Sequence, residues 1–133
     1  MQAILLIIFL CLCGCSQKSP EYFQERGRGI TAALIEELSA IDDVDALLER
    51  LPYLESLFEA LVDQIIEARK WQIKQGASFT ISEQDAELSA KLASELNRLM
   101  LNPLACHFIE KSQQKALERL DAFEKRVKAS PKL

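Results

Sequence analysis

Apolar side chains recur at helical spacing along most of the chain after residue 19. Positions that return every three to four residues, or at multiples of this spacing, are typical of the buried face of a helix. No segment alternates between apolar and polar residues for long enough to indicate a sheet. The pattern therefore predicts an all-α protein. In the first predicted helix the apolar positions are Phe23, Ile30, Leu34, Leu38 and Ile41.

Local signals predict where this helix begins and where it breaks. Ser19 before Pro20 is typical of an N-cap followed by a first-turn proline. The segment 26–29 has the sequence Arg-Gly-Arg-Gly, and each interior glycine costs about 1 kcal/mol relative to alanine. We expect this segment to be a flexible basic joint, or else a small anion site or a contact with lipid headgroups.

The second predicted helix starts at Asp42 and Asp43 and follows a heptad pattern. Pro52 interrupts the pattern without shifting its phase. Because an interior proline removes a hydrogen bond and costs about 3 kcal/mol, we expect a kink there or a helix that ends near Arg50. Gly76 is the expected C-cap. The predicted seam comprises Leu47, Leu51, Leu54, Phe58, Leu61, Ile65 and Ala68, widened by Leu57, Val62 and Ile66.

Two further helices follow. Ser82-Glu83-Gln84-Asp85 is similar to a capping box, with Ile81 placed to act as a hydrophobic staple. Asn102 before Pro103 predicts the start of the final helix, which ends at Ser130-Pro131. Short connections between four main helices predict a small antiparallel bundle. In the third predicted helix the apolar face comprises Leu88, Leu92, Leu96, Leu99 and Met100, and the solvent face includes Ser89, Lys91, Glu95 and Arg98. In the final helix the apolar positions are Ile109, Ala116 and Phe123, which alternate with Cys106, Leu120 and Val127.

The first fourteen residues form an apolar run without a charged side chain. As a helix such a run extends about 21 Å, whereas a membrane span needs roughly 17 to 25 apolar residues. The run is therefore shorter than a span and has the size of the apolar region of a secretory signal peptide.

The end of this run, Leu12-Cys13-Gly14-Cys15, resembles the lipobox of bacterial lipoproteins. The resemblance covers only about the first fifteen residues. It implies that the Cys15 thiol receives a diacylglycerol, that the preceding peptide is removed, and that acylated Cys15 becomes the mature N-terminus. The expected organisation is a signal peptide over 1–14, a short tether over 15–19, a single helical domain over 20–129 and a tail over 130–133.

The lipoprotein interpretation also predicts location. Three residues separate Cys15 from Ser19, and each adds at most about 3.5 Å, so we expect the domain to lie almost on the membrane surface. Ser16 would be the second mature residue. It is not the aspartate that signals inner-membrane retention in the enteric sorting system that such lipoproteins resemble. We therefore expect the outer membrane, facing the periplasm, rather than the inner membrane. Cys106 would be the only free thiol of the mature chain.

Charge narrows the choice of partners. The chain of 133 residues has a formal net charge of −4, which argues against a general nucleic-acid-binding protein. Between Lys111 and Lys132 the balance is reversed, with seven basic and three acidic residues. This basic final helix is either a solvated face or a contact surface for anionic headgroups or an acidic partner.

Candidate chemistry is sparse. Cys106 and His107 are adjacent, but neighbours on a helix point about 100° apart and do not converge on one atom. Cys106 is expected to be a small buried hydrophobe on the apolar face. A cluster of acidic residues lies between positions 36 and 45. It lacks the spacing of a calcium loop and is explained by helix capping and solubility. We therefore predict no catalytic residue, metal ligand or cofactor. The cluster comprises Glu36, Glu37, Asp42, Asp43 and Asp45.

Two functional hypotheses follow. The first is a non-catalytic helical lipoprotein, anchored to the membrane through Cys15, that acts as an envelope adaptor, scaffold or assembly factor similar to a pilotin. Its partner would be another envelope protein, and a heptad seam also allows a homo-oligomer. The alternative is a small protein or enzyme that binds lipid or cell-wall fragments in a pocket between helices. The polar residues on the predicted apolar faces are Cys106 and Gln113.

Overall fold

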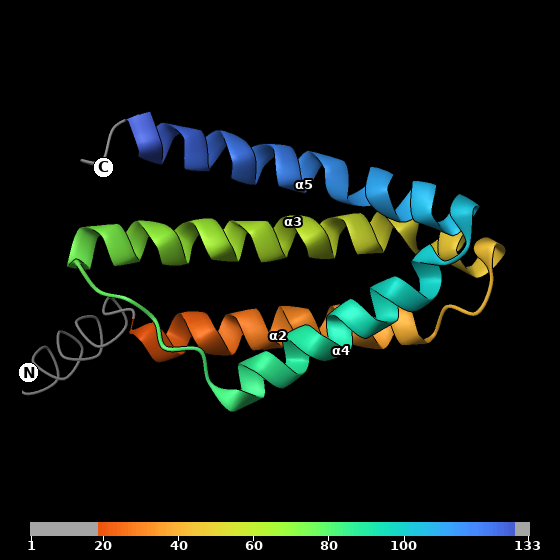
Figure 1. Ribbon diagram of the computed structural model, residues 1–133, viewed down its shortest axis with the longest axis horizontal. Helices are drawn as coiled ribbons and strands as arrows, with labels where there is room; N and C mark the ends of the chain where they lie inside the picture. The colour runs from red at the N-terminus through yellow and green to blue at the C-terminus, as the bar shows by residue number, and fades with distance from the viewer. Residues whose placement is uncertain (1–18, 130–133) are drawn as a thin grey trace, which may run out of the picture.

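A computed structural model describes residues 19–129, which form four α-helices and no strand (Figure 1). The prediction of an all-α bundle with four main helices is confirmed. Residues 1–18 and 130–133, with the expected signal peptide, Cys15 and the tail, lie outside the described residues. The helices are α2 (Pro20–Ser39), α3 (Val44–Gln75), α4 (Glu83–Met100) and α5 (Pro103–Ala129).

The bundle consists of two antiparallel helical hairpins, α2 with α3 and α4 with α5 (Figure 1). The second hairpin lies on the first with corresponding helices side by side. Because Lys115 contacts Glu59 and Arg119 contacts Asp63, α5 runs parallel to α3. In the same way α4 runs parallel to α2, to which it also packs. The principal interface is thus between two parallel helices that the loop 76–82 and α4 separate in sequence.

Side chains and a glycine mark the helix ends as expected. Ser82 and Asp85 form a reciprocal capping box at the start of α4. Gly76 ends α3 with φ 64°, a left-handed conformation that favours glycine. Ile81 is 79% exposed, so the expected hydrophobic staple is wrong. The other capping side chains are Ser19 for α2, Asp43 for α3 and Asn102 for α5.

α2 passes through the segment 26–29 without a break, so the expected flexible joint is wrong. A Cβ atom added at Gly27 or Gly29 would meet nothing within 4 Å, and no close approach requires these glycines. Phe23 before the segment and Leu34 after it are buried. Burial of such a side chain contributes roughly 1.5–3 kcal/mol, which outweighs the cost of about 1 kcal/mol for each glycine.

α3 is also continuous, with Pro52 in its interior, and it does not end near Arg50. Leu47 and Leu54 lie on either side of the proline and are fully buried. Their burial holds both flanking turns against the rest of the bundle. Packing therefore maintains the helix across a position that local propensity disfavours.

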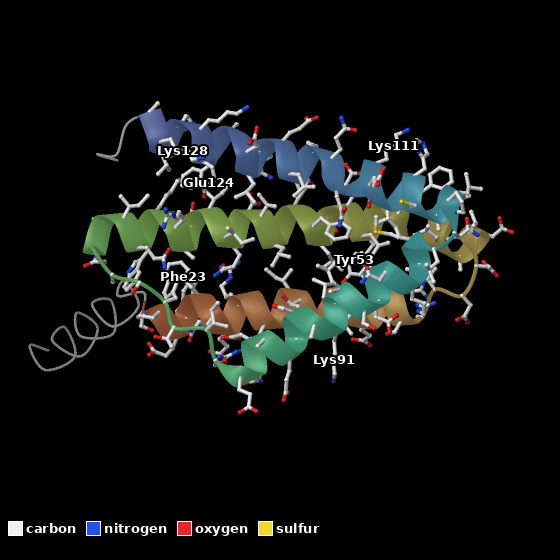
Figure 2. All side chains as sticks on the ribbon, in the orientation of Figure 1. Phe23, Tyr53, Lys91, Lys111, Glu124 and Lys128 are labelled. Carbon is white, nitrogen blue, oxygen red and sulfur yellow. The ribbon has the colours of Figure 1, made fainter. Side chains whose placement is uncertain are left out.

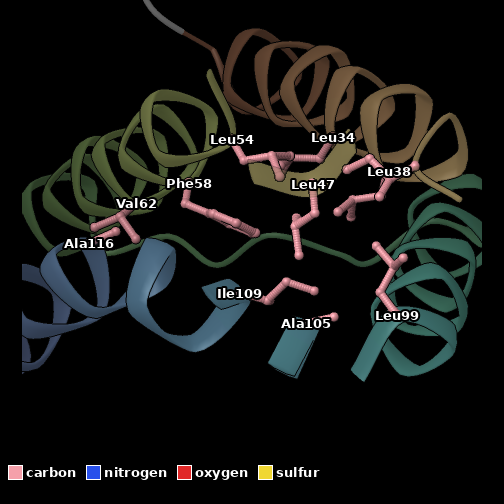
Figure 3. Close-up of a cluster of buried hydrophobic side chains, with 11 residues drawn as sticks. Leu34, Leu38, Leu47, Leu54, Phe58, Val62, Leu99, Ala105, Ile109 and Ala116 are labelled. Atoms are coloured by element: carbon pink, nitrogen blue, oxygen red, sulfur yellow. The ribbon is translucent and has the colours of Figure 1, made fainter. Parts of the chain in front are cut away.

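The core lies where all four helices meet, toward the turns between α2 and α3 and between α4 and α5 (Figure 3). Each helix contributes side chains to the core. In α4 the only buried side chain is that of Leu99. The predicted apolar face of α4 is otherwise half-buried. The largest fully buried side chains are Leu34, Leu38, Ile41, Leu47, Leu54 and Ile109.

The buried stripe of α3 departs from the predicted seam in its second half. Leu61 is half-buried and Ile65 is 42% exposed, whereas Val62 and Gln64 are buried. Val62 and Gln64 point about 200° apart around the helix, so they do not belong to one stripe. α3 packs against both α5 and α2, and Gln64 faces α2, where it donates to the Phe23 backbone oxygen.

In α5 the predicted positions Ile109, Ala116 and Phe123 are buried, which confirms that part of the pattern. The alternating positions differ, because Ala105 and Ser112 are buried, whereas Cys106, Leu120 and Val127 are half-buried.

Arg98 has a different role from the solvent-facing one expected. Its guanidinium donates hydrogen bonds to the backbone oxygens of Leu38, at 2.8 Å, and Ile41, at 3.1 Å. The last turn of α2 contains no basic residue of its own. Arg98 therefore supplies from α4 the cation and the donors that the C-terminal end of α2 lacks.

Candidate functional site

The two ends of the elongated bundle differ in composition. One end, here called the acidic end, consists of residues 36–49 and the turn 101–104. The other, here called the basic end, consists of residues 19–23, 68–82 and 125–129, where α2 begins and where α3 and α5 finish (Figure 1). The described chain starts at the basic end, at Ser19.

Six acidic residues and no basic residue lie between positions 36 and 49. Two of them have structural roles: Asp43 caps α3, and Glu37 contacts Arg50 at 2.6 Å. Glu36, Asp42, Asp45 and Glu49 are exposed. Within residues 19–129 no group of three or more histidine, cysteine or acidic side chains is arranged to hold a metal ion.

Apolar side chains are exposed beside these carboxylates. Leu101 is 85% exposed in the turn before α5, and Leu104 is 52% exposed in the first turn of that helix. Leu48, near the start of α3, is 41% exposed. An apolar surface bordered by negative charge suits a protein partner with apolar and basic side chains.

The basic end carries six basic residues, all in the segments 68–82 and 125–129, and one acidic residue, Glu21. Lys70 contacts Glu67 at 3.4 Å, and Lys125 contacts Asp121 at 2.9 Å. No ion pair between described residues involves the other four, which are all exposed: Arg69, Lys74, Arg126 and Lys128.

An aromatic cluster fixes the loop after α3 to the start of α2. The rings of Trp71 and Phe79 stack with centroids 5.6 Å apart, and Phe23 lies 5.8 Å from Trp71. Gln64 donates a hydrogen bond from its side chain to the Phe23 backbone oxygen at 2.8 Å. Sequence analysis missed Gln64 because a glutamine between apolar positions has no distinguishing pattern until its backbone acceptor is known.

A groove of about 210 Å³ runs beside this cluster. Its walls are mostly apolar, with amide and hydroxyl groups and the carboxylate of Asp85. The Gln64 amide and the Asp85 carboxylate already have hydrogen-bond partners within the protein. The volume is below the roughly 300–1,000 Å³ typical of small-molecule sites. The lining residues include Phe23, Leu61, Ile65, Ala68, Phe79 and Ile81.

The segment 26–29 does not direct both of its arginines toward one site. Arg28 contacts Asp85 at 2.6 Å between Nε and Oδ1, and it also donates to the Ser82 hydroxyl. The Arg28 guanidinium, with the hydroxyl of Ser82, lowers the pKa of Asp85 to about 2. Arg26 donates instead to the Tyr22 hydroxyl at 2.9 Å. Arg28 thus joins α2 to the capping box of α4.

Cys106 and His107 face different neighbours. The Cys106 thiol is half-buried, not buried as expected, because Ala105 and Ile109 occupy the inward positions. Its Sγ lies 3.4 Å from a Glu110 carboxylate oxygen. Partial burial and this carboxylate raise the pKa of the Cys106 thiol, which favours the protonated form. His107 is exposed and its ring packs edge-on beside a neighbouring phenylalanine.

A wider hollow of about 710 Å³ lies along α5. Every residue that lines it belongs to this one helix, so it is a surface depression and not a pocket between helices. The lining residues are His107, Glu110, Lys111, Gln114, Leu117 and Glu118.

Comparisons of the chain with models of protein families, with curated proteins and with solved structures found no match. Within residues 19–129 no helix is both long and apolar enough to cross a membrane.

Proposed function

We propose that this chain is a small bacterial lipoprotein, anchored through acylated Cys15, that acts as a non-catalytic adaptor, scaffold or assembly factor in the cell envelope. Its acidic end binds another envelope protein. One observation carries the proposal: the start of the described chain and the exposed leucines of the acidic end lie at opposite ends of the bundle. A chain tethered at one end thus presents an exposed apolar surface at the other.

The anchor is sufficient to hold such a domain at a membrane. Each buried CH₂ of an acyl chain contributes about 0.8 kcal/mol, so several chains anchor a protein where one chain gives only reversible binding. The sequence after the anchor agrees with the outer membrane, facing the periplasm, because Ser16 is not an aspartate.

The acidic end defines the chemistry of the partner. Leu101 and Leu104 offer apolar contacts, and the exposed carboxylates of the segment 36–49 give the same end of the bundle negative charge. A partner surface with apolar residues and a basic rim would match both features, with the charges adding mainly to specificity and to the rate of association.

The alternative function is a carrier of lipid or cell-wall fragments. The apolar groove beside Phe79 favours it, since an acyl chain would fit apolar walls. Its small volume favours the adaptor function instead.

Two experiments in the native envelope test the proposal. Metabolic labelling with a fatty-acid analogue should label the wild-type chain and a Cys106→Ser control but not Cys15→Ser. A photo-crosslinking residue at position 104 should then capture an envelope protein, whereas the same residue at position 117 should not. Leu104 and Leu117 are a matched pair, both on α5 and 52% and 53% exposed. Equal crosslinking from both positions would contradict a partner site at the acidic end.

A further inference from the structure

We propose that the basic end is itself a membrane contact, which lies on anionic phospholipid headgroups and directs the acidic end away from the bilayer. This inference rests on the proposed function, because it takes the anchor at Cys15 as given. It adds a second contact and therefore an orientation. Without a second contact, the short tether would leave the bundle free to lie on the membrane with any of its sides.

Exposed basic side chains gather at the basic end. The last turns of α3 and α5 finish together, and Arg69, Lys74, Arg126 and Lys128 are exposed there without an ion pair between described residues. Helix C-termini favour cations, which accounts for part of this pattern. The opposite end is mixed, since α4 carries Arg98 in its last turn, whereas α2 carries Glu36 and Glu37 near its C-terminus. Basic side chains close to an anionic bilayer each strengthen binding by about fivefold.

The aromatic cluster is the second argument. Tryptophan and tyrosine are enriched at membrane interfaces, where an apolar ring meets headgroups. The chain has a single tryptophan, Trp71, and it lies at the basic end together with Tyr22. Ile81, in the loop of the same end, is 79% exposed. The fold gives no internal reason for that exposure, whereas insertion at the headgroup boundary would cover the side chain.

Geometry is the third argument. Ser19 begins the described chain at the basic end, and three residues separate it from Cys15. α3 has 32 residues, so it extends about 48 Å from one end of the bundle to the other. The Debye length is about 8 Å at physiological ionic strength, and the carboxylates of the acidic end are therefore screened from a membrane at the basic end. Figure 2 shows Phe23 and Lys128 at one end and Lys111 toward the other.

Trp71 allows a direct test in the full acylated chain. The protein is reconstituted in vesicles of phosphatidylcholine alone, or of phosphatidylcholine and phosphatidylglycerol in equal amounts, each prepared with and without brominated phosphatidylcholine. Bromine quenches tryptophan that lies at the bilayer surface. We expect strong quenching of Trp71 in the anionic vesicles, weaker quenching in the neutral ones, and a decrease when salt is added.

Charge reversal provides the matched control. In Lys74→Glu/Lys128→Glu, quenching in the anionic vesicles should fall to the level seen in neutral vesicles. Lys91→Glu/Lys111→Glu makes the same charge change at exposed lysines away from the basic end and should quench as the wild type does. Helical circular dichroism checks that both variants fold.

The outcomes separate this inference from the proposed function. A chain that carries acyl groups and floats with the vesicles, but shows equal Trp71 quenching in neutral and anionic lipid, has an anchor without the second contact and overturns the inference. The inference is also overturned if a photo-crosslinker at position 81 captures an envelope protein, because the basic end would then be a protein interface. A chain without acyl groups overturns the proposed function; salt-sensitive quenching of Trp71 in anionic vesicles would still support the surface contact.

Discussion

Replacing Arg98 by methionine tests how the second hairpin is held on the first. The methionine keeps an unbranched stem on α4 but removes the guanidinium that donates to Leu38 and Ile41. Arg98→Met therefore leaves the C-terminal carbonyls of α2 without these donors, and it also removes the ion pair with Glu95.

The magnitude follows from the contacts. A hydrogen bond from a charged donor contributes about 1.5–3 kcal/mol when well buried. The Arg98 side chain is 42% exposed, which reduces this contribution to about 1 kcal/mol for each of the two bonds. The total loss is thus about 2 kcal/mol. A domain of this size has a urea m-value of about 2 kcal/mol/M, so the unfolding midpoint should fall by about 1 M.

Urea unfolding followed by circular dichroism measures this shift. Lys91→Met is the matched control, because Lys91 is an exposed cation on the same helix and participates in no hydrogen bond or ion pair between described residues. Its midpoint should lie within a few tenths of a molar unit of the wild type. Arg98→Lys should give an intermediate loss, since an ammonium keeps the charge but not the fork of donors.

Equal midpoints for Arg98→Met and Lys91→Met would refute the reasoning. The link between α2 and α4 would then depend on apolar contacts alone.

Three further predictions concern single positions. The pKa of Asp85 is lowered from 3.8 to about 2 in the folded chain. Its ion pair therefore stabilises the fold above about pH 4 and loses this effect as the pH falls toward 2. Asp85→Asn should lower the unfolding midpoint at neutral pH but match the wild type near pH 2. Gly29→Ala should stabilise the chain by about 0.5–1 kcal/mol in thermal unfolding, since its Cβ meets open space inside a helix, and a lower midpoint would contradict the continuous α2. Alkylation of Cys106 at neutral pH should be slower than that of the unfolded chain, because its thiol is half-buried and its pKa is raised; equal rates would contradict that environment.

Local signals in the sequence predict the helices well. Capping residues such as Asp43, the Ser82–Asp85 box and Gly76 act over one turn of backbone, so their effect does not depend on the rest of the fold. The same local reasoning fails at 26–29, where it predicts a flexible joint, and at Pro52, where it allows a helix end that does not occur. There burial of distant side chains outweighs the intrinsic preference of the backbone.

The pairing of helices is less accessible to sequence analysis. An apolar stripe on α3 predicts that a neighbour covers it but does not identify α5 as that neighbour, or indicate that the two run parallel. Arg98 and Gln64 illustrate the same limit, because each has backbone acceptors that come from another helix. The candidate surfaces are partly predictable from the sequence. The charges of the two ends are visible in it, whereas their placement at opposite ends of the bundle follows only from the fold.

The exposed side chains at the two ends also show where packing reasoning does not suffice. Ile81 and Leu101 are the most exposed of the large apolar residues described. One lies in the loop of the basic end and the other in the turn of the acidic end. Neither is needed by the core, and each belongs to a surface for which a partner is proposed.

The intact mass of the mature protein, isolated from its native membrane, tests the central claim most directly. The account predicts a chain that lacks residues 1–14 and carries acyl groups on Cys15, with a Cys15→Ser variant that keeps the unprocessed mass. A wild-type protein that retains Met1, or one that begins elsewhere with an unmodified Cys15, would contradict it.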